Sequence, residues 1–198
     1  MKYNISVESI VGKKKRYEDH CCFKSYGDDV LVVLADGMGD TDCAKEAAEC
    51  TANSIIDNFD TNIPVPDALF KSILFANDVI MNTCLERGCK MGCAVAVVYV
   101  QDGRIWFVSL GNVRIYIHNA NTKECITTDD VYTASNGNRF LTRSISGKNL
   151  QGKIAIKEHT TKGTSSITLE TDGYYNHDEL DDATIVHIAQ VTETGAIF

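Results

Sequence analysis

The sequence lacks a long apolar run. Its two longest apolar stretches, residues 30–35 and 93–100, have the length of a strand and are too short to cross a membrane. The amino terminus shows no basic segment followed by an apolar one, so we expect no leader peptide. Repeats, low-complexity tracts and linkers are also missing, which predicts one domain over residues 1–198. Together these absences predict a cytoplasmic protein without membrane contact.

The 8 cysteines include no Cys-x-x-Cys pair, and no histidine follows them at zinc-finger spacing. A zinc site and a disulfide framework are therefore disfavoured. Several cysteines stand where a small apolar side chain would serve, such as Cys43 and Cys50 in an expected helix and Cys93 in an expected strand. We interpret them as reduced and mostly buried thiols.

Positive charge is in short supply, because 19 lysines and arginines face 27 acidic residues and the net charge is −8. Such a chain repels nucleic-acid backbones and anionic membranes. We therefore expect no nucleic-acid partner. A phosphorylated substrate would depend on local positive groups and on metal ions.

Hydrophobic patterning predicts many strands and two helices. Strands are expected at residues 3–9, 21–26, 30–34, 93–100, 104–110, 114–118, 124–128, 153–158, 166–170 and 184–189. Asp42 can cap a first helix that runs to about residue 59. A second helix should begin around Pro64 and Pro66 and end at Gly88.

Four acidic signals follow one another along the chain, each where a strand is expected to run into a loop. They are Glu18-Asp19, Asp36-Gly37, Asp172-Gly173 and Asp181-Asp182. Carboxylates so far apart can share cations only if the fold brings them together, and oxygen ligands suit magnesium or manganese better than zinc. A pair of such ions is a known solution for hydrolysing phosphate esters. The pattern therefore favours a phosphatase.

Six segments, in this order, resemble the metal-dependent protein phosphatases of the 2C type. They are residues 12–19 (GKKKRYED), 34–39 (LADGMG), 111–114 (GNVR), 141–145 (LTRSI), 171–173 (TDG) and 181–186 (DDATIV). The resemblance implies an α+β fold in which two antiparallel β-sheets pack as a central sandwich between flanking helices, in α-β-β-α layers. It also implies a phosphoserine or phosphothreonine protein substrate.

The resemblance implies a site for two Mn²⁺ or Mg²⁺ ions that activate the attacking water. The implied metal ligands are Glu18, Asp19, Asp36, the Gly37 carbonyl, Asp172 and Asp181. Asp36 would bridge both ions and form the catalytic set with Asp19 and Lys14. Lys14 stands where the family usually places an arginine that binds the substrate phosphate, and Arg16 is a second candidate for that contact.

This chain departs from the family pattern in three places. Asn112 replaces an aspartate that helps to hold a third, weaker metal, so that site should be weakened. Only residues 173–180 separate the third and fourth acidic signals, so one helical layer should be reduced and one sheet face exposed. An exposed apolar face usually finds a partner, which makes a homo-oligomer possible. The short stretch between Arg114 and Asp172 also leaves little room for a flap beside the cleft.

Two functions from different classes remain open. The first is a metal-dependent serine/threonine protein phosphatase, favoured because all four principal aspartates are retained. The alternative is a catalytically weak, phosphatase-like regulatory or binding module, favoured by Asn112, by Lys14 and by the reduced helical layer. A phosphatase of small phosphomonoesters is a third, weaker candidate.

Overall fold

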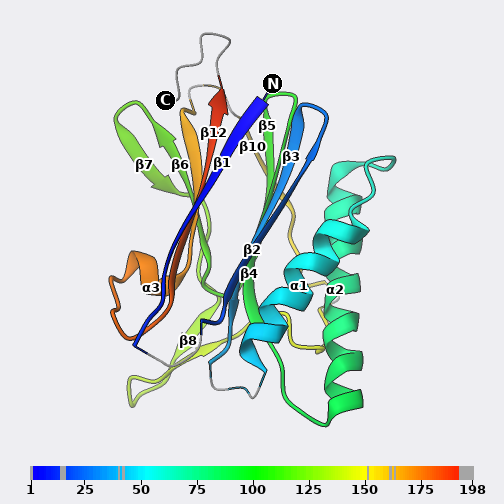
Figure 1. Ribbon diagram of the computed structural model, residues 1–198, viewed down its shortest axis with the longest axis vertical. Coiled ribbons are helices and arrows are strands. Elements are labelled where there is room, and N and C mark those ends of the chain that lie inside the picture. The colour runs from blue at the N-terminus through cyan, green and yellow to red at the C-terminus, as the bar shows by residue number, and fades with distance from the viewer. Residues whose placement is uncertain are drawn as a thin grey trace.

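The computed structural model describes residues 2–13, 17–39, 41, 43–150, 152–160, 162 and 164–191. Two five-stranded antiparallel sheets pack face to face, and α1 and α2 cover the outer side of one of them (Figure 1). The covered sheet, here called the β3 sheet, has the order β10 (Lys157–Thr160), β5 (Arg104–Leu110), β4 (Cys93–Gln101), β3 (Asp29–Gly37) and β2 (Asp19–Tyr26). The other, the β1 sheet, has the order β1 (Lys2–Ile10), β12 (Ala183–Val191), β11 (Ser166–Glu170), β6 (Arg114–Asn119) and β7 (Thr122–Cys125).

The helices begin and end where the sequence indicates. Helix α1 (Ala44–Asn58) is rich in alanine on its buried face, and α2 (Val65–Arg87) starts directly after Pro64. Gly88 ends α2 in the left-handed conformation, with φ of 65°, and donates its N–H to the Cys84 carbonyl at 2.9 Å. The expected cap Asp42 lies outside the described residues.

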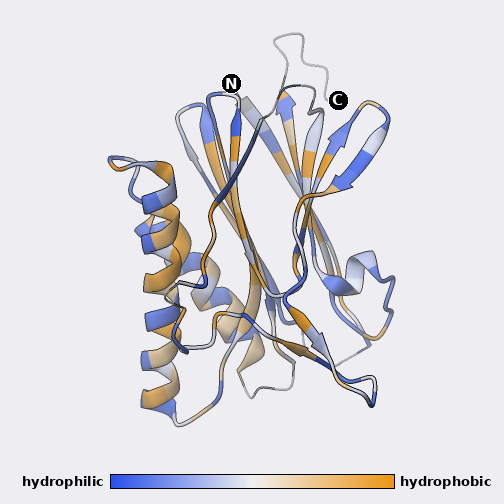
Figure 2. Cartoon of the chain, turned by 180° about the vertical axis from the view of Figure 1, so that it is seen from behind, coloured by the Kyte–Doolittle hydropathy of each residue, from blue (hydrophilic) through white to orange (hydrophobic). Residues whose placement is uncertain are grey.

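Strand β3 is buried on both faces. Its odd-numbered residues, such as Leu31 and Val33, pack toward the helices, whereas Val32 and Leu34 pack toward the β1 sheet. Each face belongs to a separate apolar core, and the apolar colouring follows the inner strands and the facing sides of the helices (Figure 2). The middle of the β3 sheet is therefore fixed by packing from both sides.

The expected α-β-β-α arrangement with one reduced layer is confirmed. In the described part of the chain, the β1 sheet has only the four-residue helix α3 (Asp172–Tyr175) beside it (Figure 1). The face of that sheet which points away from the β3 sheet is polar, however, and not apolar as expected. Residues there include Tyr116, His118, Thr168 and Glu170, which alternate with the inward-facing residues of β6 and β11. The described residues of β6 and β11 thus offer no apolar face for self-association there, and the oligomeric state stays an untested prediction.

Two strand predictions were wrong in position, and one hairpin was missed. The strand expected at residues 153–158 is β10, at Lys157–Thr160, and the strand expected at 124–128 is β7, at Thr122–Cys125. Strand β7 starts earlier because a tight turn pairs Asn119 with Thr122, and the chain leaves the ladder after Cys125. Strands β8 (Val131–Thr133) and β9 (Arg139–Leu141) form a hairpin that the sequence reading left as loop. The segment thus holds a short flap after all.

The cysteines are all free thiols. Cys93 is buried and Cys125 is exposed, while the other six are partly exposed. Helix α2 is long and apolar enough to cross a membrane by length and composition, and it is the one such helix among the described residues. Its residues Leu69, Ile73 and Ile80 are fully buried against α1 and the β3 sheet, as in a core helix.

Candidate metal centre

A pocket of about 240 Å³ lies where β3 runs into the loop before α1. It brings together three carboxylates and one glycine from distant parts of the sequence: Asp36, Gly37, Asp172 and Asp181. Four of the six expected ligands therefore line one cavity. The other two, Glu18 and Asp19, are not among its lining residues, although β2 pairs Asp19 directly with Asp36 and the Glu18 carboxylate lies next to Gly39 of the pocket.

Asp19 and Asp36 are the electrostatic centre of the site. Asp19 is 2% exposed, and burial raises its pKa to about 7, although the hydroxyls of Thr184 and Thr171 donate hydrogen bonds of 2.7 and 3.0 Å to its Oδ2 atom. Desolvation also raises the pKa of Asp36 well above its ordinary value, with further contributions from the charges of Asp19, Asp172 and Asp181. Burial and like charges together therefore disfavour the charged forms of Asp19 and Asp36.

The Glu18 segment is held in place by Asp182. The Asp182 carboxylate accepts the backbone N–H groups of Gly12 at 2.8 Å and of Glu18 at 2.7 Å. Asp182 therefore caps the segment that leads into β2. The Glu18 carbonyl in turn accepts the N–H of Gly37 at 3.1 Å, and a Cβ atom at Gly37 would lie 2.4 Å from the Ala44 carbonyl oxygen. Only glycine fits at that close approach, so the Asp-Gly pair of the loop has a steric cause.

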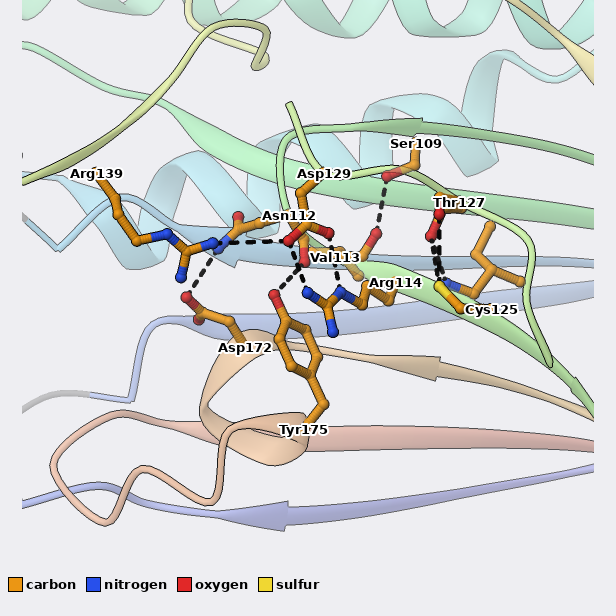
Figure 3. A network of polar contacts seen from close by, with 11 residues as sticks. Ser109, Asn112, Val113, Arg114, Cys125, Thr127, Asp129, Arg139, Asp172 and Tyr175 are labelled. Carbon is orange, nitrogen blue, oxygen red and sulfur yellow. Dashed lines mark hydrogen bonds and ion pairs between the residues drawn. The ribbon is translucent and has the colours of Figure 1, made fainter. Parts of the chain in front are cut away.

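Asp172 is positioned by a network that sequence reasoning missed (Figure 3). The side-chain amide of Asn112 donates to Asp172 Oδ2 at 2.8 Å, and the Tyr175 hydroxyl donates to the Asn112 carbonyl at 2.9 Å. The Arg114 guanidinium lies 3.8 Å from the centroid of the Tyr175 ring and binds Asp129 through two hydrogen bonds of 2.8 and 2.9 Å. The side chain of Asn112 therefore positions Asp172, a role beyond that of a turn residue.

The missed hairpin supplies one wall of the pocket. Arg139 of β9 lines it together with Phe140 and Leu141, and it is the one cationic side chain among the described lining residues. Its guanidinium lies 3.7 Å from Asp129. The signal that could have found it is the Asn136-Gly137 pair, a strong hairpin sequence, which the structure shows as a turn with positive φ at Gly137.

The remaining expected residues are placed as follows. Lys14 and Arg16 lie outside the described residues. Met38 lines the pocket and donates its backbone N–H to the Gly92 carbonyl at 2.9 Å, in keeping with a packing role. Arg143 stabilises its own loop, as expected, through Asp130 at 2.8 Å and the Lys153 carbonyl at 2.6 Å.

The donor set suits hard divalent cations. Carboxylate and carbonyl oxygens are the ligands that Mg²⁺ and Mn²⁺ take up, and the raised pKa values of Asp19 and Asp36 mark a place where positive charge would be stabilising. Among the residues that the structure describes, however, no group of three or more histidine, cysteine or acidic side chains is arranged so that it could hold a metal ion.

Comparison with known structures places the fold. The serine/threonine phosphatase PstP/Ppp of Mycobacterium tuberculosis matches with a TM-score of 0.80 at 17% identity, covering 96% of this chain and 99% of that chain. Stp1 of Staphylococcus aureus matches with a TM-score of 0.82 at 15% identity and 96% coverage of both chains. PppA of Pseudomonas aeruginosa, described as a regulatory component of the type VI secretion system, gives 0.75 at 18% identity, covering 96% of this chain and 98% of that one.

At these identities the structures show the fold alone. No curated protein sequence matches the chain. The model of the protein phosphatase 2C family, however, matches residues 9–195 and so spans nearly the whole sequence. The chain therefore belongs to the protein phosphatase 2C family, whose members are metal-dependent serine/threonine protein phosphatases.

Proposed function

We propose that this chain removes phosphate from phosphoserine and phosphothreonine in proteins, with two Mn²⁺ or Mg²⁺ ions held by the carboxylates of the pocket. The observation that carries the proposal is the convergence of Asp36, Asp172 and Asp181 on one cavity, with Asp19 paired to Asp36 on the neighbouring strand. Ions bound there would lower the pKa of a coordinated water and neutralise charge on the phosphoryl oxygens.

The protein's own groups position this set. The Thr171 and Thr184 hydroxyls both donate to Oδ2 of Asp19 and so fix the orientation of its carboxylate. Asn112 does the same for Asp172. Under this proposal Glu18 and the Gly37 carbonyl complete the ligand set, with Gly37 fixed by its N–H bond to the Glu18 carbonyl.

Substrate phosphate needs positive charge at the rim, because the pocket itself is acidic. Arg139, on the hairpin of β8 and β9, supplies positive charge at the pocket. Its ion pair with Asp129 is weak, so its guanidinium can exchange Asp129 for the substrate phosphate. Lys14 and Arg16 remain proposed phosphate contacts.

The single domain over residues 1–198 and the cytoplasmic location also remain predictions.

The test is phosphate release from a phosphothreonine peptide in the presence of manganese, magnesium or a chelator. We expect release with either metal and none with the chelator. Zinc, an ion that favours nitrogen and sulfur ligands, serves as the control metal in the same assay. Metal-dependent binding of the phosphopeptide without release would identify the weak binding module instead, and release that is indifferent to the chelator would refute the metal site.

A further inference from the structure

Cys43 and Cys89 lie side by side although 46 positions separate them in the sequence. The Cys43 thiol donates a hydrogen bond to the Cys89 sulfur, and the two Sγ atoms are 3.4 Å apart. Both side chains are partly exposed, so a small oxidant can reach them. Among the described residues no other two thiols are in such contact, and the spacing in sequence gives no hint of the pair.

The pair joins two helix ends. Cys43 occupies the position before the first residue of α1, and Cys89 follows Gly88, which ends α2. Next to them Arg87 forms an ion pair with Glu46, which already ties the same two helix ends together. The hydrogen bond to Cys89 raises the pKa of Cys43, and the nearby charge of Arg87 acts in the opposite direction. The net effect raises the pKa of Cys43, so what favours oxidation here is geometry: two partly exposed sulfurs in contact let one capture a sulfenic acid formed on the other.

We propose that Cys43 and Cys89 are a disulfide-forming site for peroxide oxidants. In the first step, hydrogen peroxide transfers one oxygen to the sulfur of one cysteine, giving a sulfenic acid and one water. In the second, the other sulfur attacks the sulfenic sulfur, the S–O bond breaks, and a second water leaves with the proton of the attacking thiol. Two thiols lose two electrons in total, and the peroxide accepts them.

The site lies directly behind the loop that carries Gly37. Met38, the next residue, donates its N–H to the Gly92 carbonyl, and a Cβ atom at Gly92 would lie 2.0 Å from Met38 Cε, so the segment after Cys89 packs tightly on this loop. Closing a disulfide of about 2.05 Å requires the 3.4 Å sulfur separation to shorten. We expect this movement to pull the loop and weaken metal binding at Gly37, a consequence that rests on the proposed function.

The experiment treats the whole chain with hydrogen peroxide, blocks remaining thiols by alkylation and maps disulfides by mass spectrometry. A Cys43–Cys89 cross-link that dithiothreitol reverses is the expected result. Cys43→Ser and Cys89→Ser should each abolish it, whereas Cys125→Ser, which alters an exposed thiol elsewhere, should not. Absence of the cross-link in a folded wild-type chain, or a peroxide-induced disulfide of Cys89 or Cys43 with a different cysteine as the main product, would overturn the proposal.

A second readout separates this site from the proposed phosphatase activity. Peroxide should raise the manganese concentration for half-maximal phosphate release at least threefold in the wild type and leave it unchanged in Cys43→Ser. An unchanged requirement in a cross-linked wild type would overturn the link to the loop. If no phosphate is released at all, the proposed function fails, while the cross-link map still decides the disulfide.

Discussion

The side-chain amide of Asn112 donates a hydrogen bond of 2.8 Å to Oδ2 of Asp172, across 60 positions of sequence. Asn112 is itself held in place, because its backbone carbonyl accepts a hydrogen bond from the hydroxyl of Tyr175. An aspartate at this position could ligate a cation but could not donate to Asp172 unless protonated. The replacement therefore exchanges a metal-binding charge for a group that orients a carboxylate.

Asn112→Asp should change how many ions the site holds. The new carboxylate would repel Asp172 without metal and attract a further cation with it. We expect a lower melting temperature in chelator, one additional Mn²⁺ by titration calorimetry and a changed manganese requirement for turnover. Asn112→Ala is the matched control, because it removes the hydrogen bond without adding charge, and it should weaken activity or metal affinity roughly 10-fold. If Asn112→Asp gains neither ion nor rate, the third metal has no role here.

Asp36→Asn should abolish phosphate release and leave a folded protein. If Asp36 bridges both ions as proposed, its loss should cost more than the roughly 10- to 100-fold effect typical of an outer-shell partner. Because neighbouring charges and burial raise the pKa of Asp36, the amide should make the metal-free protein more stable. Peptide turnover and thermal melting in chelator check both effects. Undiminished turnover would contradict the assignment of Asp36.

Metal should stabilise the fold. If each ion binds only the folded state, manganese at one hundred times its dissociation constant adds about 2.7 kcal/mol per site to the free energy of unfolding. Calcium should also raise the melting temperature but support little turnover, because its coordination is looser. Melting curves over a manganese titration, with chelator as the baseline, give the measurement. Curves indifferent to both would argue against a metal centre.

The stability of the protein should depend on Lys123, which pairs with a buried carboxylate on the polar face of the β1 sheet. Glu170 is 1% exposed, and Lys123 donates to its Oε1 atom at 2.6 Å. Lys123→Met should lower the free energy of unfolding by about 1–3 kcal/mol, because it leaves a buried carboxylate without its charged partner. Arg104→Met, which removes an exposed ion pair with Glu158, should cost only about 0–1 kcal/mol. Equal losses in urea denaturation would show that the Lys123 pair is not special.

His118 should make stability fall in mild acid. Burial lowers the pKa of His118 below 6.5, and the charge of Lys123 lowers it further. The folded state therefore favours the neutral ring, which shares a 3.0 Å hydrogen bond with Thr168. The contribution is complete above the unfolded pKa and is lost as pH falls through it, roughly from pH 7 to 5.5. Melting temperatures in chelator over that range should fall more steeply for the wild type than for His118→Gln. Parallel curves would remove His118 as the cause.

The sequence predicted the parts of the fold that local patterning determines. Strands β3 and β4 are continuous apolar runs, and Gly88 ends a helix for a conformational reason, so both were found. The acidic signals that line the pocket were found because each lies at or near a strand end: Asp36 near the end of β3, Asp172 after β11 and Asp181 before β12. The bond from Asn112 to Asp172 was not, because only tertiary structure brings the loop before β6 and α3 together.

Arg139 was missed for a different reason. Strands β8 and β9 have three residues each, too few to show a period, and only the turn between them carries a signal. The polar face of the β1 sheet was also misjudged, although the alternation of Arg114, Tyr116 and His118 with isoleucines records it. The missing helical layer is matched by polar residues on the strands that it would have covered.

Strand β3 is buried on both faces, and this constrains which part of the metal centre can evolve. Asp36, at its end, is fixed by two separate cores, so it cannot shift to suit ions of different radius without disturbing both. If the proposed ligands are right, adaptation to a particular ion would then come from the segments that carry Glu18 and Asp181, whose backbone is held by hydrogen bonds such as those of Asp182. One anchored ligand and several adjustable ones would let related chains change metal preference while the sandwich stays the same.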